Sequence, residues 1–188
     1  MFENSKSRHE NIKRLSQIIK NCAIKEGDFK LSSGISSTFY FDIKRLCLMP
    51  EYFIDLGKIL YFEIAENLQN NRFHVGGLES GAIPLSMLIS AQSSQNVFPF
   101  YIRKENREHG IKNKIVGHIS KDFPIVIIDD VLTSGNSLIN SVYRLQAETT
   151  LRPSLAICVI DRGQNSEEKI YYKTGVKLFS FFKEGEFE

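Results

Sequence analysis

Hydrophobic side chains recur at helical spacing in two segments near the start of the chain. Ser7 and Glu10 have the spacing of a capping box, and the apolar positions that follow predict an amphipathic helix over residues 8–23. A second helix begins at Pro50, a residue favoured in the first turn of a helix. Between the two helices, apolar and polar residues alternate around a Ser/Gly segment. This predicts a strand pair or hairpin with Phe29, Leu31, Phe39, Phe41 and Ile43 at its apolar positions.

The rest of the chain alternates between short apolar runs and helical patterns. The runs lie at Val75, Val97–Ile102, Ile115–Ile119, Ile125–Ile128 and Leu155–Ile160, and helices are expected from near Pro84 and over residues 137–147. Continuous apolar strands that alternate with helices are typical of a parallel sheet covered on both faces. We therefore predict an α/β fold with a doubly wound parallel sheet over residues 46–188. Residues 1–45 form a small helix-and-hairpin cap in the same single domain.

Composition excludes several classes of protein. The 188 residues are 42% apolar and 24% charged, with 12 Gly and 5 Pro, which is the balance of a globular domain and neither collagen-like nor disordered. No run approaches the roughly 18 apolar residues of a membrane helix. The polar N-terminus lacks an export signal, so we expect a cytoplasmic protein without a membrane partner. Cys22, Cys47 and Cys158 lack CxxC spacing and lie in apolar contexts, which predicts free buried thiols.

Positive charge is concentrated in one segment. Residues 103–114 carry five basic and two acidic side chains, a net +3, whereas the whole chain carries +2, so the remainder is net −1. This distribution points to a small anionic ligand and not to nucleic acid.

The segment from Ile125 to Ser137 is the strongest candidate for chemistry. Asp129 and Asp130 follow a buried strand, and a Thr/Ser/Gly turn then leads into a helix. The amides of such a turn and the helix N-terminus suit a phosphate, whereas the carboxylates suit sugar hydroxyls or Mg²⁺ held partly through water. A ribose phosphate satisfies both halves. The alternative is that the two acids only end a strand before a capped turn. Neither the Walker loop nor the GxGxxG fingerprint is present.

The run Val126–Gly135, Val-Ile-Ile-Asp-Asp-Val-Leu-Thr-Ser-Gly, resembles the phosphoribosyl-pyrophosphate (PRPP) motif of type I phosphoribosyltransferases. Three further segments narrow the resemblance to the orotate phosphoribosyltransferase family. Tyr101–Gly110 is similar to its flexible catalytic loop, residues 27–34 and 39–42 to its N-terminal hairpin, and Ile160–Gly163 to its substrate-side loop. The matches follow the family's order over about residues 25–165.

The resemblance implies a type I phosphoribosyltransferase-like fold with a small N-terminal hood, and it implies PRPP and orotate as substrates with Mg²⁺ as cofactor. The products are orotidine 5′-monophosphate and pyrophosphate. It assigns PRPP binding to Asp129, Asp130, Val131, Leu132, Thr133, Ser134, Gly135, Asn136 and Ser137, with the two aspartates also catalytic and in indirect contact with the metal. Arg103, Lys104, Arg107 and His109 are the implied catalytic cations and donors for the departing diphosphate, on a loop that reaches the neighbouring site of a homodimer. The alternative for this loop is a solvated basic segment, and for His109 a donor in place of a general acid.

The resemblance assigns orotate to Thr133 and Arg162, and Tyr40 and Phe41 are candidates for the wall of the base pocket. A guanidinium holds a carboxylate in plane, but Arg162 could instead form a surface ion pair with Asp161, and the aromatics could be plain core. Gly76–Ala82 corresponds to the pyrophosphate loop. In this loop we expect Glu79 to hold Mg²⁺-bound water, a basic neighbour or the loop itself.

This chain departs from the fullest family pattern at three positions. Ser32 and Gly81 stand where some members have Lys, and Asn136 stands where a small residue or Thr is commoner. Two other functions remain open: a type I enzyme for another base, and a PRPP-binding regulatory protein. The basic loop and Arg162 argue against the first, and the lack of a helix-turn-helix extension in this sequence argues against the second.

Overall fold

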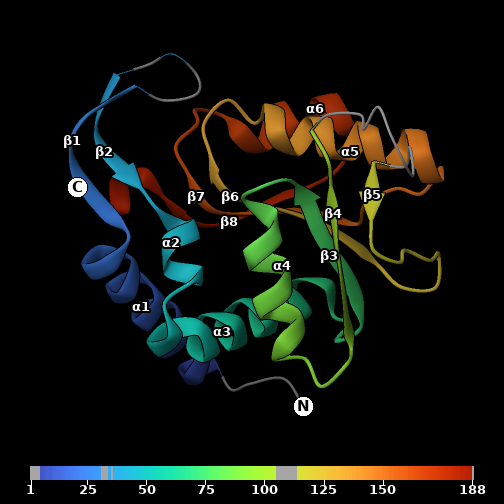
Figure 1. Cartoon of the computed structure of the whole chain (residues 1–188), viewed down its shortest axis with the longest axis horizontal. Coiled ribbons are helices and arrows are strands. Elements are labelled where there is room, and N and C mark those ends of the chain that lie inside the picture. Colours follow the sequence, from blue (N-terminus) through green and yellow to red (C-terminus); the bar gives the residue numbers. More distant parts are fainter. Residues whose placement is uncertain (1–4, 31–33, 35, 105–113, 188) are drawn as a thin grey trace.

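The chain forms a six-stranded sheet with helices on both faces and a two-stranded hairpin beside it (Figure 1). The computed structural model describes residues 5–30, 34, 36–104 and 114–187. Within these ranges the helices are α1 (Ser5–Cys22), α2 (Ile43–Cys47), α3 (Pro50–Leu68), α4 (Ala82–Ala91), α5 (Asn136–Thr149) and α6 (Ser166–Thr174). The strands are β1 (Ile24–Lys30), β2 (Ser36–Phe41), β3 (Phe73–Leu78), β4 (Val97–Ile102), β5 (Ile115–Val116), β6 (Ile125–Leu132), β7 (Leu155–Asp161) and β8 (Leu178–Lys183). A 3₁₀ helix, Glu184–Glu186, follows β8.

The strands of the main sheet lie in the order β5-β4-β3-β6-β7-β8. Every neighbouring pair is parallel except β4 and β5, which are antiparallel. The chain runs outward from β3 to β4 and then returns past β3 to β6, so the direction of winding reverses between β3 and β6. Helices α3 and α4 lie on one side of the sheet and α5 and α6 on the other (Figure 1). The predicted doubly wound fold is confirmed, with an antiparallel edge strand that the pattern did not indicate.

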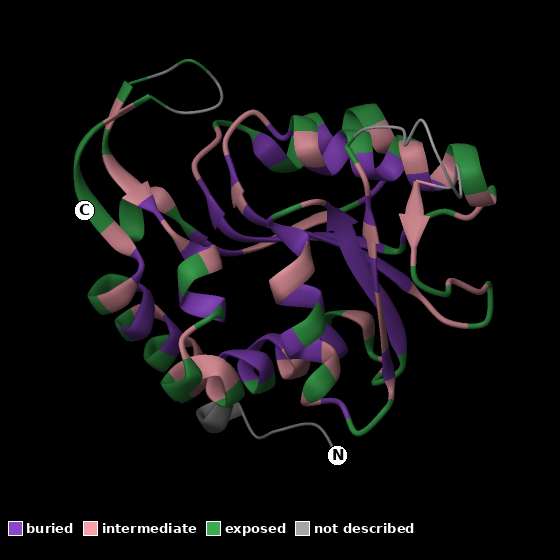
Figure 2. Ribbon diagram, viewed as in Figure 1, coloured by how far each residue is buried: buried purple, intermediate pink, exposed green. Residues whose placement is uncertain are grey.

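The core consists of two hydrophobic clusters, one on each face of the sheet. Alternate residues of β6 enter different clusters: Val126 and Ile128 pack in one, and Ile125 and Ile127 in the other. Figure 2 shows the central strands as buried. Because both faces of the strand are covered, β6 reads as a continuous apolar run in the sequence.

The N-terminal segment joins one of these clusters and also forms the hairpin. Leu15 and Ile19 of α1 are fully buried in the same cluster as α3 and α4. Strands β1 and β2 pair antiparallel, and most of their residues are exposed or half-buried (Figure 2). Ile43 was expected to continue the strand, but it begins α2, because the Asp42 side chain accepts a hydrogen bond from the Arg45 N–H at 3.2 Å and caps the helix.

Two further boundaries differ from the prediction. Gly76 and Gly77 were assigned to a phosphate-binding loop, but both lie in buried β3, and only residues 79–81 connect this strand to α4. A Cβ atom on Gly76 would lie 2.2 Å from the Phe100 carbonyl oxygen, and one on Gly77 would lie 2.3 Å from that of Ile128. These glycines therefore allow close approach of the neighbouring strands. The strand expected over Ile115–Ile119 is only two residues long, since Gly117 takes a φ of +121°.

The helices agree with the expectation from composition, and so do the cysteines, except that Cys22 was predicted to be buried and is not. Cys22, Cys47 and Cys158 are all free; Cys47 and Cys158 are buried, whereas Cys22 is partly exposed. Burial raises the pKa of the Cys47 thiol to about 12 and also raises that of Cys158, so both stay protonated and unreactive. No helix in the described ranges has the length and apolar character to cross a bilayer.

Candidate active site

A pocket of about 350 Å³ lies at the carboxyl edge of the sheet. It is lined from the ends of β3 and β6, the segments after β4 and β7, the hairpin and α2. Its lining residues are Lys30, Tyr40, Phe41, Lys44, Leu78, Glu79, Ser80, Gly81, Lys104, Asp129, Asp130, Val131, Thr133, Ser137 and Arg162. In open α/β sheets ligands bind at this edge, beside the point where the winding reverses. The fold therefore brings together candidate residues that are far apart in the sequence.

Asp129 and Asp130 lie inside β6 and not after it, which corrects the predicted boundary. Burial, followed by the neighbouring Asp130 carboxylate, raises the pKa of Asp129 well above its usual range. Lys44 of α2 donates to Asp130 Oδ2 at 3.0 Å. Burial is the largest single influence on the pKa of Lys44 and lowers it, but the charge of Asp130, the hydrogen bond to it and the nearby Tyr40 and Asp129 together raise it by more. The pair of acids is thus partly neutralised by one lysine and has capacity for a further cation or for hydroxyl donors.

Gly81 lies directly against this pair of carboxylates. A Cβ atom at this position would lie 2.6 Å from Asp130 Oδ1, 2.9 Å from its Cγ and 3.2 Å from Asp129 Oδ1. The backbone of Gly81 is ordinary right-handed helix, with φ −62° and ψ −42°, so only space excludes a side chain. A side chain at this position would therefore have to displace the carboxylates, and positive charge reaches Asp130 from Lys44 instead.

The turn after β6 leads into α5 through Gly135, which caps the helix with a φ of +76°. A left-handed residue at this position favours glycine. Thr133 and Ser137 line the pocket, whereas the Leu132 side chain is only 2% exposed and packs in the core, so Leu132 can offer a ligand only its backbone. Lys169 of α6 donates to the Ser134 carbonyl at 2.6 Å, and Asn136 N–H donates to Ser134 Oγ at 3.4 Å. The turn presents backbone amides at a helix N-terminus, which is a geometry suited to an anion.

The basic segment enters the site at Lys104, which lines the pocket, whereas Arg103 does not. Glu79 Oε1 accepts from the Lys104 N–H at 2.7 Å. The contact joins Glu79 to the backbone of the basic segment, and not to the loop over residues 76–82 that was named among its expected partners. Arg107 and His109 lie outside the described residues, as does Ser32.

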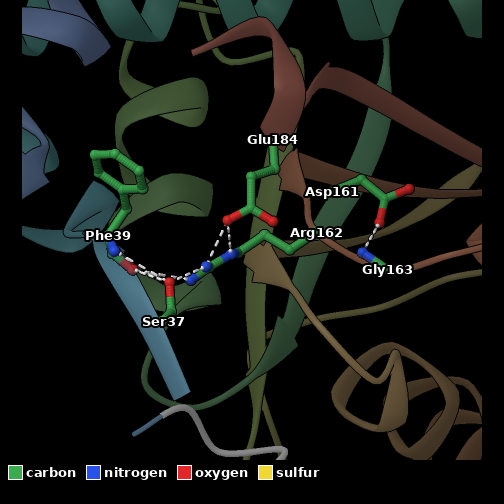
Figure 3. Close-up of polar contacts among 6 residues, drawn as sticks. All are labelled: Ser37, Phe39, Asp161, Arg162, Gly163 and Glu184. Carbon is green, nitrogen blue, oxygen red and sulfur yellow. Dashed lines mark hydrogen bonds and ion pairs between the residues drawn. The ribbon is translucent and has the colours of Figure 1, made fainter. Parts of the chain in front are cut away.

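Arg162 follows β7, and its side chain is only 5% exposed. Figure 3 shows its guanidinium between Glu184 and the hairpin. Its Nε donates to Glu184 Oε1 at 2.8 Å, its Nη2 to Ser37 Oγ at 2.6 Å and its Nη1 to the Phe39 carbonyl at 3.3 Å. The alternative prediction, an ion pair between Arg162 and Asp161, is wrong, because Arg162 pairs with Glu184. Asp161 instead accepts from Lys183 Nζ at 2.6 Å and from the Gly163 N–H at 2.9 Å.

Tyr40 and Phe41 both line the pocket. Phe41 is also core, since it is 4% exposed and packs edge-on against Phe187. The Arg162 guanidinium lies 5.4 Å from the centre of the Phe41 ring, a cation–π distance. The pocket therefore has an apolar wall on the side of the guanidinium.

Sequence reasoning missed two lysines of the pocket, Lys30 at the end of β1 and Lys44 in α2. Lys44 and Arg45 stand between Ile43 and Leu46, which are both fully buried, so a pair of basic residues in an otherwise apolar segment was the available signal. Glu184 was also missed, because the 3₁₀ helix that carries it has no periodic pattern.

The donors around Asp129 and Asp130 fit Mg²⁺ only as a partial ligand set. Within the described ranges no group of three or more His, Cys, Asp or Glu side chains could hold a metal ion. Mg²⁺ is commonly bound by one or two carboxylates together with water and substrate phosphates. The two aspartates match that arrangement.

Comparison with known proteins agrees with the fold. Residues 45–186 match the phosphoribosyl transferase domain family. Orotate phosphoribosyltransferase of Aquifex aeolicus is 34% identical over 176 residues, covering 90% of this chain and 93% of that protein. The enzyme of the same name from Leptospira biflexa is 33% identical, covering 86% and 88%. Orotate phosphoribosyltransferase of Mycobacterium tuberculosis H37Rv, solved in complex with PRPP, has a TM-score of 0.71 at 19% identity, covering 95% and 92%.

The chain belongs to the phosphoribosyl transferase family. The curated relatives named above are both orotate phosphoribosyltransferases, and each matches this chain over more than four fifths of its length.

Proposed function

We propose that this protein is an orotate phosphoribosyltransferase of pyrimidine nucleotide synthesis. It transfers the phosphoribosyl group of PRPP to a ring nitrogen of orotate and releases pyrophosphate. The observation that carries the proposal is the pocket in which Asp129 and Asp130 lie beside the turn that opens α5. Such a site has acceptors for a sugar and amides for a phosphate. The names of the relatives support the same activity.

In the proposed complex, the 5′-phosphate of PRPP binds the amides of the turn from Thr133 to Ser137. The amides at a helix N-terminus are neutral groups held in fixed positions, and their N–H dipoles suit an anion. The ribose hydroxyls donate to Asp129 and Asp130, which both line the pocket and are therefore within reach of a ligand bound there. This arrangement sets the orientation of the sugar and hence of C1.

The diphosphate of PRPP leaves as the bond from C1 breaks, and its negative charge grows in the transition state. Lys104 lines the pocket where that charge develops, and the resemblance adds Arg103, Arg107 and His109. Fixed cations lower the barrier most when they meet charge that exists only in the transition state. When bound, Mg²⁺ would neutralise charge on the diphosphate, with Asp129 and Asp130 as its protein contacts through water or substrate.

Arg162 and Thr133 are proposed to hold orotate, with Tyr40 and Phe41 against its ring. The Arg162 guanidinium already contacts Ser37 and Phe39 of the hairpin, so a substrate carboxylate would take over a donor from one of them. Because Glu184 Oε1 lies against both Nε and Nη2, Nη1 is the donor that orotate would engage, in place of the Phe39 carbonyl.

The protein is further proposed to be a cytoplasmic homodimer. Leu48, Ile54 and Met87 are 75%, 55% and 55% exposed and lie at the end of α2 and on α3 and α4. Exposed apolar residues on helices that contact one another support a homodimer, in which the segment 103–114 reaches the partner's site. Three free cysteines support the cytoplasm, where thiols stay reduced.

The test is pyrophosphate release from PRPP and Mg²⁺ with orotate, adenine, hypoxanthine or uracil as acceptor. Pyrophosphate release with orotate, and with none of the other three bases, supports the proposal. Release with another base but not with orotate refutes it in favour of a different transferase. PRPP binding without release for any base would identify a regulatory protein.

A further inference from the structure

Four polar side chains of α5 form a single stripe along the helix. Ser137, Ser141, Arg144 and Glu148 follow one another at intervals of four, three and four residues, which places them on one face. Ser137 lines the pocket at the start of the helix. Ser141 Oγ accepts from the Leu78 N–H at 3.1 Å and donates to the Ser137 carbonyl at 2.8 Å, so it connects the end of β3 to α5.

Arg144 continues the stripe and contacts the first end of the basic segment. Its Nη1 donates to the Lys104 carbonyl at 2.8 Å and also to the Arg103 carbonyl. The Lys104 N–H is held by Glu79 at 2.7 Å. Both backbone groups of Lys104 are therefore bonded to charged side chains, and such hydrogen bonds are stronger than those between neutral groups.

Glu148 contacts the second end of the same segment. Both of its carboxylate oxygens accept from the Lys114 N–H, at 3.1 and 3.0 Å. The Arg103 N–H donates to the Lys114 carbonyl at 2.9 Å and closes the base of the segment. Arg144 and Glu148 lie one turn apart, so a single helix holds both ends of the chain between residues 104 and 114.

We propose that Arg144 and Glu148 are positioning residues for the transfer reaction, which fix Lys104 and Lys114, at the two ends of the basic segment, relative to the phosphate-binding turn. The inference rests on the proposed function. Arg144 lies eight residues after Asn136, about 12 Å along the helix axis. Because α5 is one continuous helix, the turn at its start and the anchors near its end keep a constant separation. A phosphate bound at the turn is thereby in a fixed position relative to Lys104.

Ordinary structural roles account poorly for these two side chains. Arg144 is half-buried and Glu148 exposed, and both bond to the backbone of the basic segment and not to the core. Their removal should therefore disturb the position of Lys104 and its neighbours more than the stability of the domain.

The experiment compares Arg144→Met with Arg152→Met, which removes the same charge from an exposed arginine just beyond α5. Steady-state kinetics with orotate and PRPP should show kcat about tenfold to a hundredfold lower for Arg144→Met and near wild type for Arg152→Met. KM for each substrate should stay within about twofold, because the displaced cations act on charge that develops in the transition state. Arg144→Lys, which keeps a donor, should recover part of the loss.

A second measurement does not depend on catalysis. Amide hydrogen exchange at Lys114 should be about tenfold faster in Glu148→Met, whereas Glu148→Gln retains an acceptor oxygen and should exchange near the wild-type rate. If Arg144→Met matches Arg152→Met in kcat, or lowers the melting temperature by more than about 5 °C, the positioning role is wrong.

These readouts separate the inference from the proposed function. A wild-type protein that is inactive with orotate refutes the function, yet the exchange rates still test whether Glu148 holds Lys114. An active wild type with unchanged exchange in Glu148→Met refutes the inference and leaves the function standing.

Discussion

The contact between Gly81 and the pair of aspartates gives a quantitative prediction for Gly81→Ala. The new methyl group would lie 2.6 Å from Asp130 Oδ1, and ordinary contact begins at about 3.4 Å, so the carboxylate must move by about 0.8 Å. A shift of this size disturbs the contact between Asp130 Oδ2 and Lys44, which is now 3.0 Å long. It also moves the acceptor of the ribose hydroxyls.

The expected size of the effect follows from these contacts. Hydrogen bonds to charged groups contribute about 1.5–3 kcal/mol, so loss of one acceptor position should raise KM for PRPP about tenfold to a hundredfold. Overpacking costs about 1–3 kcal/mol. Gly81 is the N-cap of α4, a position where Gly is preferred to Ala, so the backbone does not offset this cost. The free energy of unfolding should therefore fall by about 1–3 kcal/mol, and KM for orotate should change little.

The measurement is a set of initial rates at varied PRPP, with a urea titration of the same protein. Gly185→Ala is the matched control, because a Cβ atom there meets nothing within 4 Å. An unchanged KM for PRPP in Gly81→Ala would show that the Asp130 carboxylate does not bind the sugar, or that it moves without cost.

Three other predictions concern separate parts of the molecule. Arg162→Ala should raise KM for orotate about tenfold or more and KM for PRPP far less, and equal changes in initial-rate measurements would mean that the arginine only supports the hairpin. Ser141→Ala leaves the Leu78 N–H without its acceptor and should lower the free energy of unfolding by about 1–3 kcal/mol in urea, whereas exposed Ser154→Ala should not. Burial lowers the pKa of His74, so protonation favours the unfolded chain, and stability should fall as the pH drops below about 6.5 towards the lowered value. Urea titrations from pH 7 to 5 should show a flatter dependence in His74→Gln than in the wild type, and an equal slope would contradict this.

The sheet and its winding could be predicted because burial on two faces leaves a direct trace in the sequence. Ile125–Ile128 reads as a strand since each side chain has an apolar layer to enter, and Pro50 marks the start of α3. The pocket followed from the same pattern, because Asp129 and Asp130 are charges at the end of an otherwise apolar strand. These features depend on residues that are close together in the chain, so they can be predicted from the sequence.

Other parts of the site depend on contacts between distant segments. Gly77 looks like a loop residue until the Ile128 carbonyl is seen 2.3 Å from its missing Cβ position. The partner of Arg162 proved to be Glu184, 22 residues away, and not the adjacent Asp161. Lys44 meets Asp130 across 86 positions of sequence. No periodicity specifies such pairs, so the sequence indicated which residues carry charge and not which charges meet.

The contacts of Arg162 have a thermodynamic consequence for selectivity. Its guanidinium is nearly saturated before any ligand arrives, so a carboxylate that enters must displace an internal acceptor, and the free energy released is only the difference between the two partners. Neutral analogues of the substrate gain no free energy from that exchange, and they have to fit beside a hairpin that stays hydrogen-bonded to Arg162. The protein would then select a carboxylate over a neutral group because the Phe39 carbonyl and the Ser37 hydroxyl are weaker hydrogen-bond acceptors than an anion. Replacing Ser37 would change the affinity for negatively charged bases without altering the shape of the pocket.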